Sequence, residues 1–564
     1  MLLDVQMKHS PDVGLAQRVT KYDSSITDIT RADEIAQRKE LVDILAQLKK
    51  IEATEKDRNV REDLEILQKT YSLQFRADDY RLDHTVTYLD PAAAVFAGLS
   101  TLLNDQVPEG RRSAALIRLR KYAGVEPGFT PFTDVLKQRM MEQMAKPGVV
   151  YPSAGEVEYQ LERNNSYVNN MRTLFDKYNL KGWQDTFFKL QQQLADFDTW
   201  IRGTVLPKCR ADSQMTPEEY AFSLQSYGID LPPELLAAQA HAAFTGIQAE
   251  MAPLAAEVAK QHGWSATDYR DVIRSLKKTQ ITGDAILPLY QARLKAVEQI
   301  IATNNLLTLP ARPAILRLQT AAETESAQVP APHFVPPPLI DNTGQKGAFV
   351  LPTNTSIVTG NKVDSFDDYT FDAAAWPMTA HEARPGNDLE FNAILEHGVS
   401  LARMMYAFNS TNLDSWGLYS EWMMQPYEPA DGQLITLQLR LLRTARAFLD
   451  SELHSSKTTP GMQPSCWRRT SSSALRTPVK RSGSSPHARR ARPIATSSVT
   501  QRCSNCARTR RRRWGLSLTP SDSTTSCWRR DCFHPISCVR PSWKSSSRLR
   551  RRKNKFNYRA SYPS

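Results

Sequence analysis

Hydrophobic residues recur at intervals of three and four over much of the first three hundred residues, with charged residues between them. Three such segments are ADEIAQRKELVDILAQLKKIEA (32–53), EDLEILQKTYSLQF (62–75) and DAILPLYQARLKAVEQIIATNNLL (284–307). This spacing places the apolar side chains on one face of an α-helix. Clusters of Pro and Gly separate the segments, and no repeat of fixed length is visible. The pattern predicts an α-helical scaffold over residues 1–329.

A proline-rich stretch, VPAPHFVPPP, follows this scaffold. Proline does not fit inside a helix, so we expect residues 330–345 to form a connector across the surface. After it, GAFVLPTNTSIVTG (347–360) is rich in β-branched and aromatic residues and predicts one or two short strands. Helical spacing then resumes to about residue 460, with one break at Pro385-Gly386. We therefore expect a second, mainly helical block over residues 346–460.

Composition fits a soluble globular protein, with 41% hydrophobic residues and a mean hydropathy of −0.47 over 564 residues. No run of about eighteen apolar residues occurs, so no membrane-spanning helix is expected. The N-terminal residues lack the apolar core of a signal peptide. This predicts a cytoplasmic protein, or an exported one if the true start lies upstream.

Charge divides the chain into two parts. About 26 of the 72 Lys and Arg residues, but only about 2 of the 60 Asp and Glu residues, follow residue 455. The end of the chain is therefore strongly basic, at about +24, and the rest is acidic, at about −12. Cys209 is the only cysteine before this end, which argues against a disulfide framework.

The basic tail, residues 461–564, allows three interpretations. It is a nucleic-acid-binding arm, a zinc knuckle, or a segment translated out of frame from a GC-rich gene. The knuckle would use Cys503, Cys506, Cys532, His534 and Cys538, whose spacing matches no common zinc finger.

The frameshift hypothesis explains most of the tail. With permitted codons and a shift of one base, residues 488–493, 505–515 and 524–534 can become Ala- and Leu-rich sequences typical of amphipathic helices. We expect such a tail to be disordered and to have no specific nucleic-acid partner. We also expect the apolar faces between Leu437 and Leu449 to lose the helices that would cover them.

Candidate chemistry lies in the second block. His381-Glu382 is a pair typical of zinc peptidases, in which the imidazole binds the metal and the carboxylate takes a proton from the bound water. The Pro-Gly break could turn position 387 towards the same ion. Asp414 and Glu421 are seven residues apart, so they share a helix face and could supply an acidic ligand.

The motifs HEARPGN (381–387), DSWGLYSE (414–421) and LRTARAFLD (442–450) together resemble the bacterial DUF885 family. The resemblance covers about residues 10–455 and implies a gluzincin-like zinc metallopeptidase with a mainly α, zincin-like body and a small β element near the active-site cleft. It implies a hydrolase that cleaves a peptide or a small amide or ester.

The resemblance also assigns roles to individual residues. His381 would be a zinc ligand and Glu382 the general base, with Asp414 or Glu421 as the acidic ligand. The substrate pocket, or support for the ligands, would come from Arg443, Arg446 and Asp450.

Two positions depart from the family pattern. Asn387 stands where the pattern has a histidine ligand, and an amide oxygen is a poor partner for zinc. Asp414 stands where the pattern has Glu, so its carboxylate is shorter by one carbon. Asp388 could substitute as an oxygen ligand. Two functions remain open: a zinc-dependent hydrolase of doubtful activity, and an inactive, truncated homologue or helical binding scaffold.

Sequencing the gene tests the frameshift hypothesis. We expect a gain or loss of one base near codon 460, after which the corrected frame continues the helical pattern. An intact frame through this region would contradict the hypothesis.

Overall fold

Polar caps start the first long helices. Thr30 accepts a hydrogen bond from the backbone N–H of Asp33 (3.3 Å) at the start of α3 (Arg31–Glu52). The Asp57 carboxylate accepts a hydrogen bond from the backbone N–H of Asn59 (2.8 Å) at the start of α4 (Arg58–His84).

The computed structural model describes residues 1–454 except 213, 321–322, 324–330, 354–355, 360–361, 366 and 408–409. The predicted tail, 461–564, lies outside these residues.

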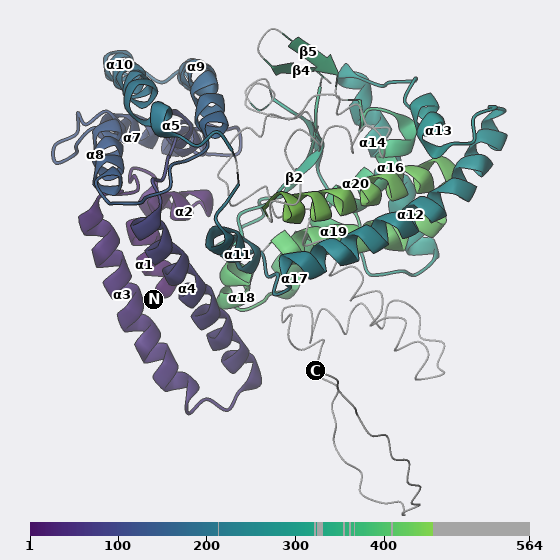
Figure 1. Ribbon diagram of the computed structural model, residues 1–564, viewed down its shortest axis with the longest axis horizontal. Helices are drawn as coiled ribbons and strands as arrows, with labels where there is room; N and C mark the ends of the chain where they lie inside the picture. Colours follow the sequence, from purple (N-terminus) through teal and green to yellow (C-terminus); the bar gives the residue numbers. More distant parts are fainter. Residues whose placement is uncertain are drawn as a thin grey trace, which may run out of the picture.

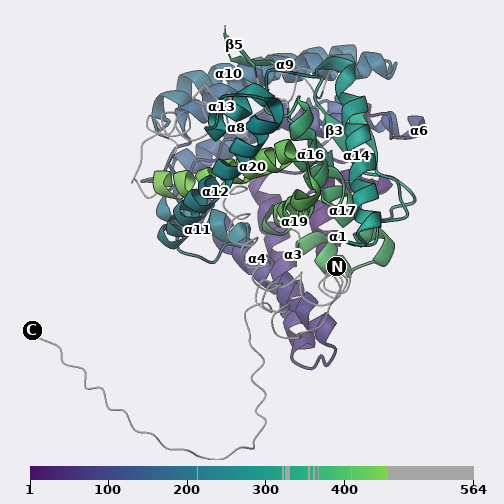
Figure 2. The ribbon, with the colours of Figure 1, turned by 90° about the vertical axis from the view of Figure 1, so that its right-hand side faces the viewer.

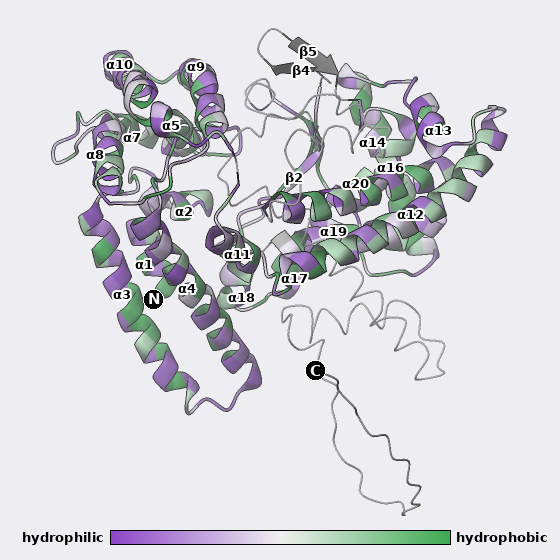
Figure 3. Cartoon of the chain, in the orientation of Figure 1, coloured by the Kyte–Doolittle hydropathy of each residue, from purple (hydrophilic) through white to green (hydrophobic). Residues whose placement is uncertain are grey.

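The first half of the chain forms two helical groups (Figure 1). In the first group, α1 (Leu2–His9) packs on the long hairpin of α3 and α4. The second group has its own hydrophobic core, and hydrophobic and hydrophilic residues alternate along its helices as they do along α3 (Figure 3). Up to residue 200, the α-helices that follow α1, besides α3 and α4, are α2 (Pro11–Ala16), α5 (Pro91–Ser100), α6 (Glu109–Arg112), α7 (Ala114–Tyr122), α8 (Phe132–Met144), α9 (Ala154–Lys177) and α10 (Gln184–Trp200).

The largest core joins helices from both sides of the proline-rich connector. α12 (Pro233–His262) lies along α20 (Ala430–His454) in both views (Figures 1 and 2). Phe244 of α12 meets Phe448 of α20 edge to face at 5.6 Å. The expectation that the apolar faces between Leu437 and Leu449 lose their cover is therefore wrong, because α12 and the other elements packed on α20 bury them.

The remaining helices surround this pair. They are α11 (Pro217–Ser226), α13 (Tyr269–Leu276), α14 (Ile286–Thr303), α16 (Ala375–Met378), α17 (Asn387–His397), α18 (Leu401–Tyr406) and α19 (Ser410–Met424). α18 reaches back to the first group, where its Tyr406 hydroxyl lies 3.3 Å from that of Tyr71 on α4. This contact ties the two halves of the chain together.

Two small sheets complete the fold. β1 (Leu316–Leu318), β2 (His333–Val335) and β3 (Ala348–Leu351) form a three-stranded sheet in the order β1-β3-β2, with β1 parallel and β2 antiparallel to β3. β4 (Ser356–Thr359) and β5 (Lys362–Ser365) form an antiparallel hairpin. The predicted mainly α body with a small β element is confirmed, although β2 falls inside the segment predicted as an irregular connector.

Within the described residues, no helix combines the length and the apolar composition needed to cross a bilayer.

Asp90 gives one pH-dependent prediction. Its Oδ1 caps α5 by accepting hydrogen bonds from the backbone N–H groups of Ala92 (2.9 Å) and Ala93 (3.2 Å). Burial outweighs these bonds and raises the pKa of Asp90 to about 7. Because this carboxyl binds its proton more tightly in the folded state, its ionisation destabilises the fold as the pH rises from about 4 to about 7.

Asp90→Asn keeps an oxygen acceptor for the cap and removes the charge. The gain in free energy of unfolding over wild type should be larger at pH 8 than at pH 5, by about 1–3 kcal/mol, in urea titrations at each pH. Asp57→Asn at the exposed cap of α4 is the matched control. Equal gains at the two pH values would contradict the prediction.

Candidate functional site

His381 and Glu382 lie in a π-helical turn, η6 (Thr379–Ala383), which directly continues α16. Such turns put one extra residue into a helix and often occur at functional sites. The chain then bends at Pro385-Gly386 before α17 begins. A Cβ atom on Gly386 would lie 1.8 Å from the backbone oxygen of His381, so this bend requires glycine.

The bend brings Asn387 to the Glu382 side chain. Asn387 Nδ2 donates a hydrogen bond to Glu382 Oε2 at 2.9 Å, and the backbone N–H of Phe334 on β2 donates to the same oxygen at 3.0 Å. The edge strand β2 therefore borders the site. Asn387 Oδ1 is buried and has no hydrogen-bond partner among the described residues.

His381 is fixed by a second, fully buried carboxylate. Its Nδ1 lies 2.7 Å from Glu421 Oε1 on α19. Arg443 of α20 donates a hydrogen bond to Glu421 Oε2 at 2.9 Å and forms an ion pair with Glu421 Oε1 at 2.9 Å. Since a carboxylate only accepts hydrogen bonds, Nδ1 carries the proton in this bond, and Nε2 is the ring nitrogen that Glu421 does not engage. Glu421 therefore orients the imidazole, as carboxylates do behind metal-binding histidines.

Opposite charges stabilise this network. Burial alone would raise the pKa of Glu421, but the charge of Arg443 and the hydrogen bond with His381 hold that pKa below its usual value. Burial opposes the charged form of His381, yet the hydrogen bond to Glu421 and the charges of Glu382 and Glu421 raise its pKa. An imidazole, a carboxylate and a guanidinium thus form a tightly coupled buried triad.

α19 packs directly against the π-helical turn. Trp416 Nε1 donates to the backbone oxygens of Pro385 (2.9 Å) and Gly386 (3.3 Å), which fastens the bend to α19. Gly417 lies under the imidazole, where a Cβ atom would come within 2.5 Å of His381 Cε1. The close approach of the two segments thus depends on the missing side chain at position 417.

Asp414 lies one helical turn before Gly417, near two charged groups. Its charge acts on Arg443 and on Glu390 of α17. Burial, with Asp414 as a second cause, raises the pKa of Glu390 well above its usual value, and Glu390 Oε2 has no hydrogen-bond partner among the described residues. Asp414 therefore lies at the edge of the triad, beside a second acid.

The remaining predicted residues lie further away. Arg446 is exposed one turn beyond Arg443, near the charge of Asp368. Asp450 is buried about 10 Å further along α20 than Arg443, where it accepts a hydrogen bond from Tyr220 of α11 at 3.1 Å. Asp388 is held by Arg384 at 3.1 Å, in a cluster with Glu298.

Several contributors to this site have no role assigned to them by the sequence motifs: the backbone N–H of Phe334, the indole of Trp416, Gly417 and Glu390. A glycine inside a helical pattern often marks a close approach of another segment, so Gly417 could have been noticed. Phe334 could not, because a contact over 48 residues leaves no local pattern.

The residues present do not fit the zinc that the family resemblance implies. Among the described residues, no group of three or more His, Cys, Asp and Glu side chains is arranged to hold a metal ion. In the triad, both oxygens of Glu421 are engaged by His381 and Arg443. At position 387, the amide offers one oxygen in place of an imidazole nitrogen, and zinc favours nitrogen and sulfur.

Comparisons with known proteins agree on the family and the fold. A model of DUF885, described as a bacterial protein of unknown function, matches residues 11–469. A solved structure from Shewanella oneidensis, described as a "putative lipoprotein of unknown function", shares 15% identity at a TM-score of 0.65 and covers 93% of this chain and 94% of its own. A second solved structure, a "putative lipoprotein" from Colwellia psychrerythraea, shares 14% sequence identity at a TM-score of 0.67. The match covers 92% of this chain and 94% of that one. No protein of curated function matches.

The close contact between Gly417 and the His381 imidazole predicts opposite effects of two glycine-to-alanine substitutions on stability. Gly417→Ala forces the new methyl group into the His381 ring and should lower the free energy of unfolding by about 1–3 kcal/mol. Gly246→Ala in α12 meets no atom within 4 Å and should be neutral or stabilise by up to about 1 kcal/mol. Urea titration of both variants measures the contrast. Equal effects would show that α19 does not press on His381.

Proposed function

Because this chain belongs to the DUF885 family of bacterial proteins of unknown function, we propose that its site derives from a zinc-dependent hydrolase of the peptidase type and has lost tight metal binding. On this proposal the present chain binds a peptide or a small amide or ester with little or no turnover. The observation that carries it is the His381–Glu421–Arg443 triad beside Glu382 and Asn387.

The triad supports hydrolase ancestry. Orienting an imidazole through Nδ1 with a buried carboxylate leaves Nε2 directed away from that carboxylate, as ligation requires. On this proposal the adjacent Glu382 holds a water molecule and accepts its proton in the ancestral hydrolase. Position 387 reaches Glu382 within 2.9 Å, so a side chain there borders the same space. Three motifs, distant in sequence, meet in one place.

The side chains at positions 387 and 414 support the proposed loss of tight metal binding. Asn387 donates an N–H hydrogen to Glu382, and its buried Oδ1 has no hydrogen-bond partner in the described parts of the chain. A histidine at this position would offer a nitrogen lone pair instead. Asp414, shorter than the Glu of the family motif, is the remaining candidate for an acidic ligand. On this proposal Arg443 and Arg446 contribute positive charge for a substrate carbonyl or carboxylate.

The solved relatives also bear on location. Each is described as a "putative lipoprotein", and lipoproteins are a class of exported proteins attached to a membrane surface. We propose that this chain works in the cell envelope.

Restoring the ligand tests the proposal. Purified full-length wild type should retain clearly less than one zinc per chain after dialysis, measured by elemental analysis. Asn387→His, alone and with Asp414→Glu, should raise zinc affinity by at least about tenfold and produce or raise peptide or ester hydrolysis. His381→Ala in the Asn387→His background should abolish the gain.

Asn59→His on the exposed start of α4 controls for an added imidazole and should change nothing. One zinc per wild-type chain that disappears in His381→Ala would show that tight binding has not been lost. No gain of zinc in either restored variant, with the fold intact by circular dichroism, would overturn the proposed ancestry.

A further inference from the structure

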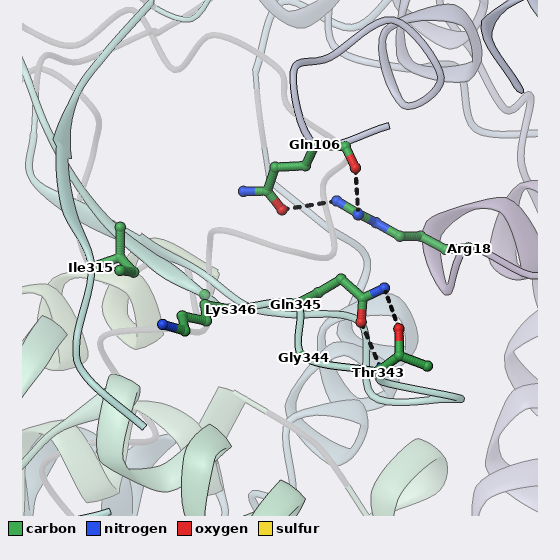
Figure 4. A pocket seen from close by; sticks show the side chains of 8 residues that line it. Arg18, Gln106, Ile315, Thr343, Gly344, Gln345 and Lys346 are labelled. Carbon is green, nitrogen blue, oxygen red and sulfur yellow. Dashed lines mark hydrogen bonds between the residues drawn. The ribbon is translucent and has the colours of Figure 1, made fainter. Parts of the chain in front are cut away.

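A pocket of about 480 Å³ lies between the N-terminal turn and the loop before β3. Arg18 and Gln106 lie along one side of it, and Ile315 and Lys346 on the other (Figure 4). Thr343, Gly344 and Gln345 of the loop complete the wall. The pocket is shallow and open to solvent, so a ligand bound here would stay partly exposed.

The two walls are joined by direct hydrogen bonds. Gln17 Oε1 accepts from the backbone N–H groups of Leu339 (2.9 Å) and Ile340 (3.3 Å), which anchors the loop to the residue preceding Arg18. Within the loop, Gln345 Oε1 accepts from the Thr343 N–H at 2.8 Å. The pocket is therefore built from segments held in place rather than from two independent surfaces.

Arg18 is the main charge of the pocket, and it has no acidic partner. Its guanidinium donates to the backbone oxygen and to Oε1 of Gln106, both at 2.9 Å, and no carboxylate among the described residues pairs with it. Partial burial and the nearby positive charge of Arg111 lower the pKa of Arg18. Arg111 itself is paired with Asp23 at 2.7 Å. A half-buried guanidinium held by neutral acceptors keeps N–H groups for an anion.

The backbone holds this arginine in an unfavourable conformation. Arg18 has a φ of +61°, in the left-handed region that usually favours glycine. Hydrogen bonds from its own N–H to Leu15 (2.9 Å) and from Val19 to Gly14 (2.9 Å) fix this turn. Strain of this kind often occurs where a side chain must be presented to a ligand.

From the pocket, the unpaired guanidinium and Lys346 on the opposite wall, we infer that the chain binds a small anionic ligand here, through a carboxylate or a phosphate on Arg18. Gln106 accepts two of the five guanidinium N–H bonds, and the remaining three can donate to the oxygens of either group. Lys346 is exposed and lies across the pocket, so it adds attraction at longer range rather than a direct second contact. The volume accommodates a ligand larger than a single ion. The inference does not depend on the hydrolase site.

Calorimetric titration of the full chain at low salt tests the inference, with inorganic phosphate and with succinate as probes. At least one probe should bind with a dissociation constant in the millimolar range or below, and the better probe identifies the preferred anion. Arg18→Gln should weaken binding at least about tenfold, and Lys346→Gln by about two- to fivefold.

Arg120→Gln, on an exposed arginine paired with Glu126 and outside the pocket lining, is the matched control and should bind as wild type does. If Arg18→Gln fails to fold, Lys346→Gln still decides, because its side chain is exposed and has no partner within the part of the chain that the structure describes, so its loss should leave the fold intact. Absence of binding for both probes, or equal binding in wild type and in whichever variants fold, would overturn the inference.

Discussion

The buried carboxylate of Glu421 is the contact on which the site depends. It stands on α19 and pairs with His381 of the π-helical turn and Arg443 of α20. Burying a charged carboxylate costs free energy unless opposite charges and hydrogen bonds replace its hydration. The Glu421 carboxylate can therefore be buried only when all three elements come together. The triad is therefore a structural requirement of the fold as well as a device for orienting an imidazole.

This double role explains how the site can change chemically without losing its shape. Asn387 is not part of the triad; among the described residues, its side chain hydrogen-bonds to Glu382. Replacing an imidazole there alters the donors offered to an ion, whereas the pairing of His381, Glu421 and Arg443 stays complete. Burial of charge thus constrains the triad, whereas position 387 can change without disturbing it.

Much of the architecture follows from local sequence pattern, and the rest depends on contacts that leave no such pattern. Periodicity places α3 and α14 within a few residues, and the Gly-bounded aliphatic run gives β3. The His381-Glu382 pair and the Asp414–Glu421 turn do meet, as motif chemistry indicates. The role of Asp450 against Tyr220 could not be foreseen, because the pairing joins positions 230 residues apart. The same holds for α12 as the cover of α20: an apolar face shows in sequence, but its partner does not.

The packing of α12 on α20 has a consequence for synthesis of the protein. Roughly 170 residues separate the end of one helix from the start of the other, so the ribosome makes α12 on the order of ten seconds before its partner exists. During that interval α20 is not available to cover the apolar side chains of α12, which include Phe244, Ile247 and Met251. The nascent chain thus exposes an aggregation-prone stripe and is a natural client for chaperones that shield helices during translation.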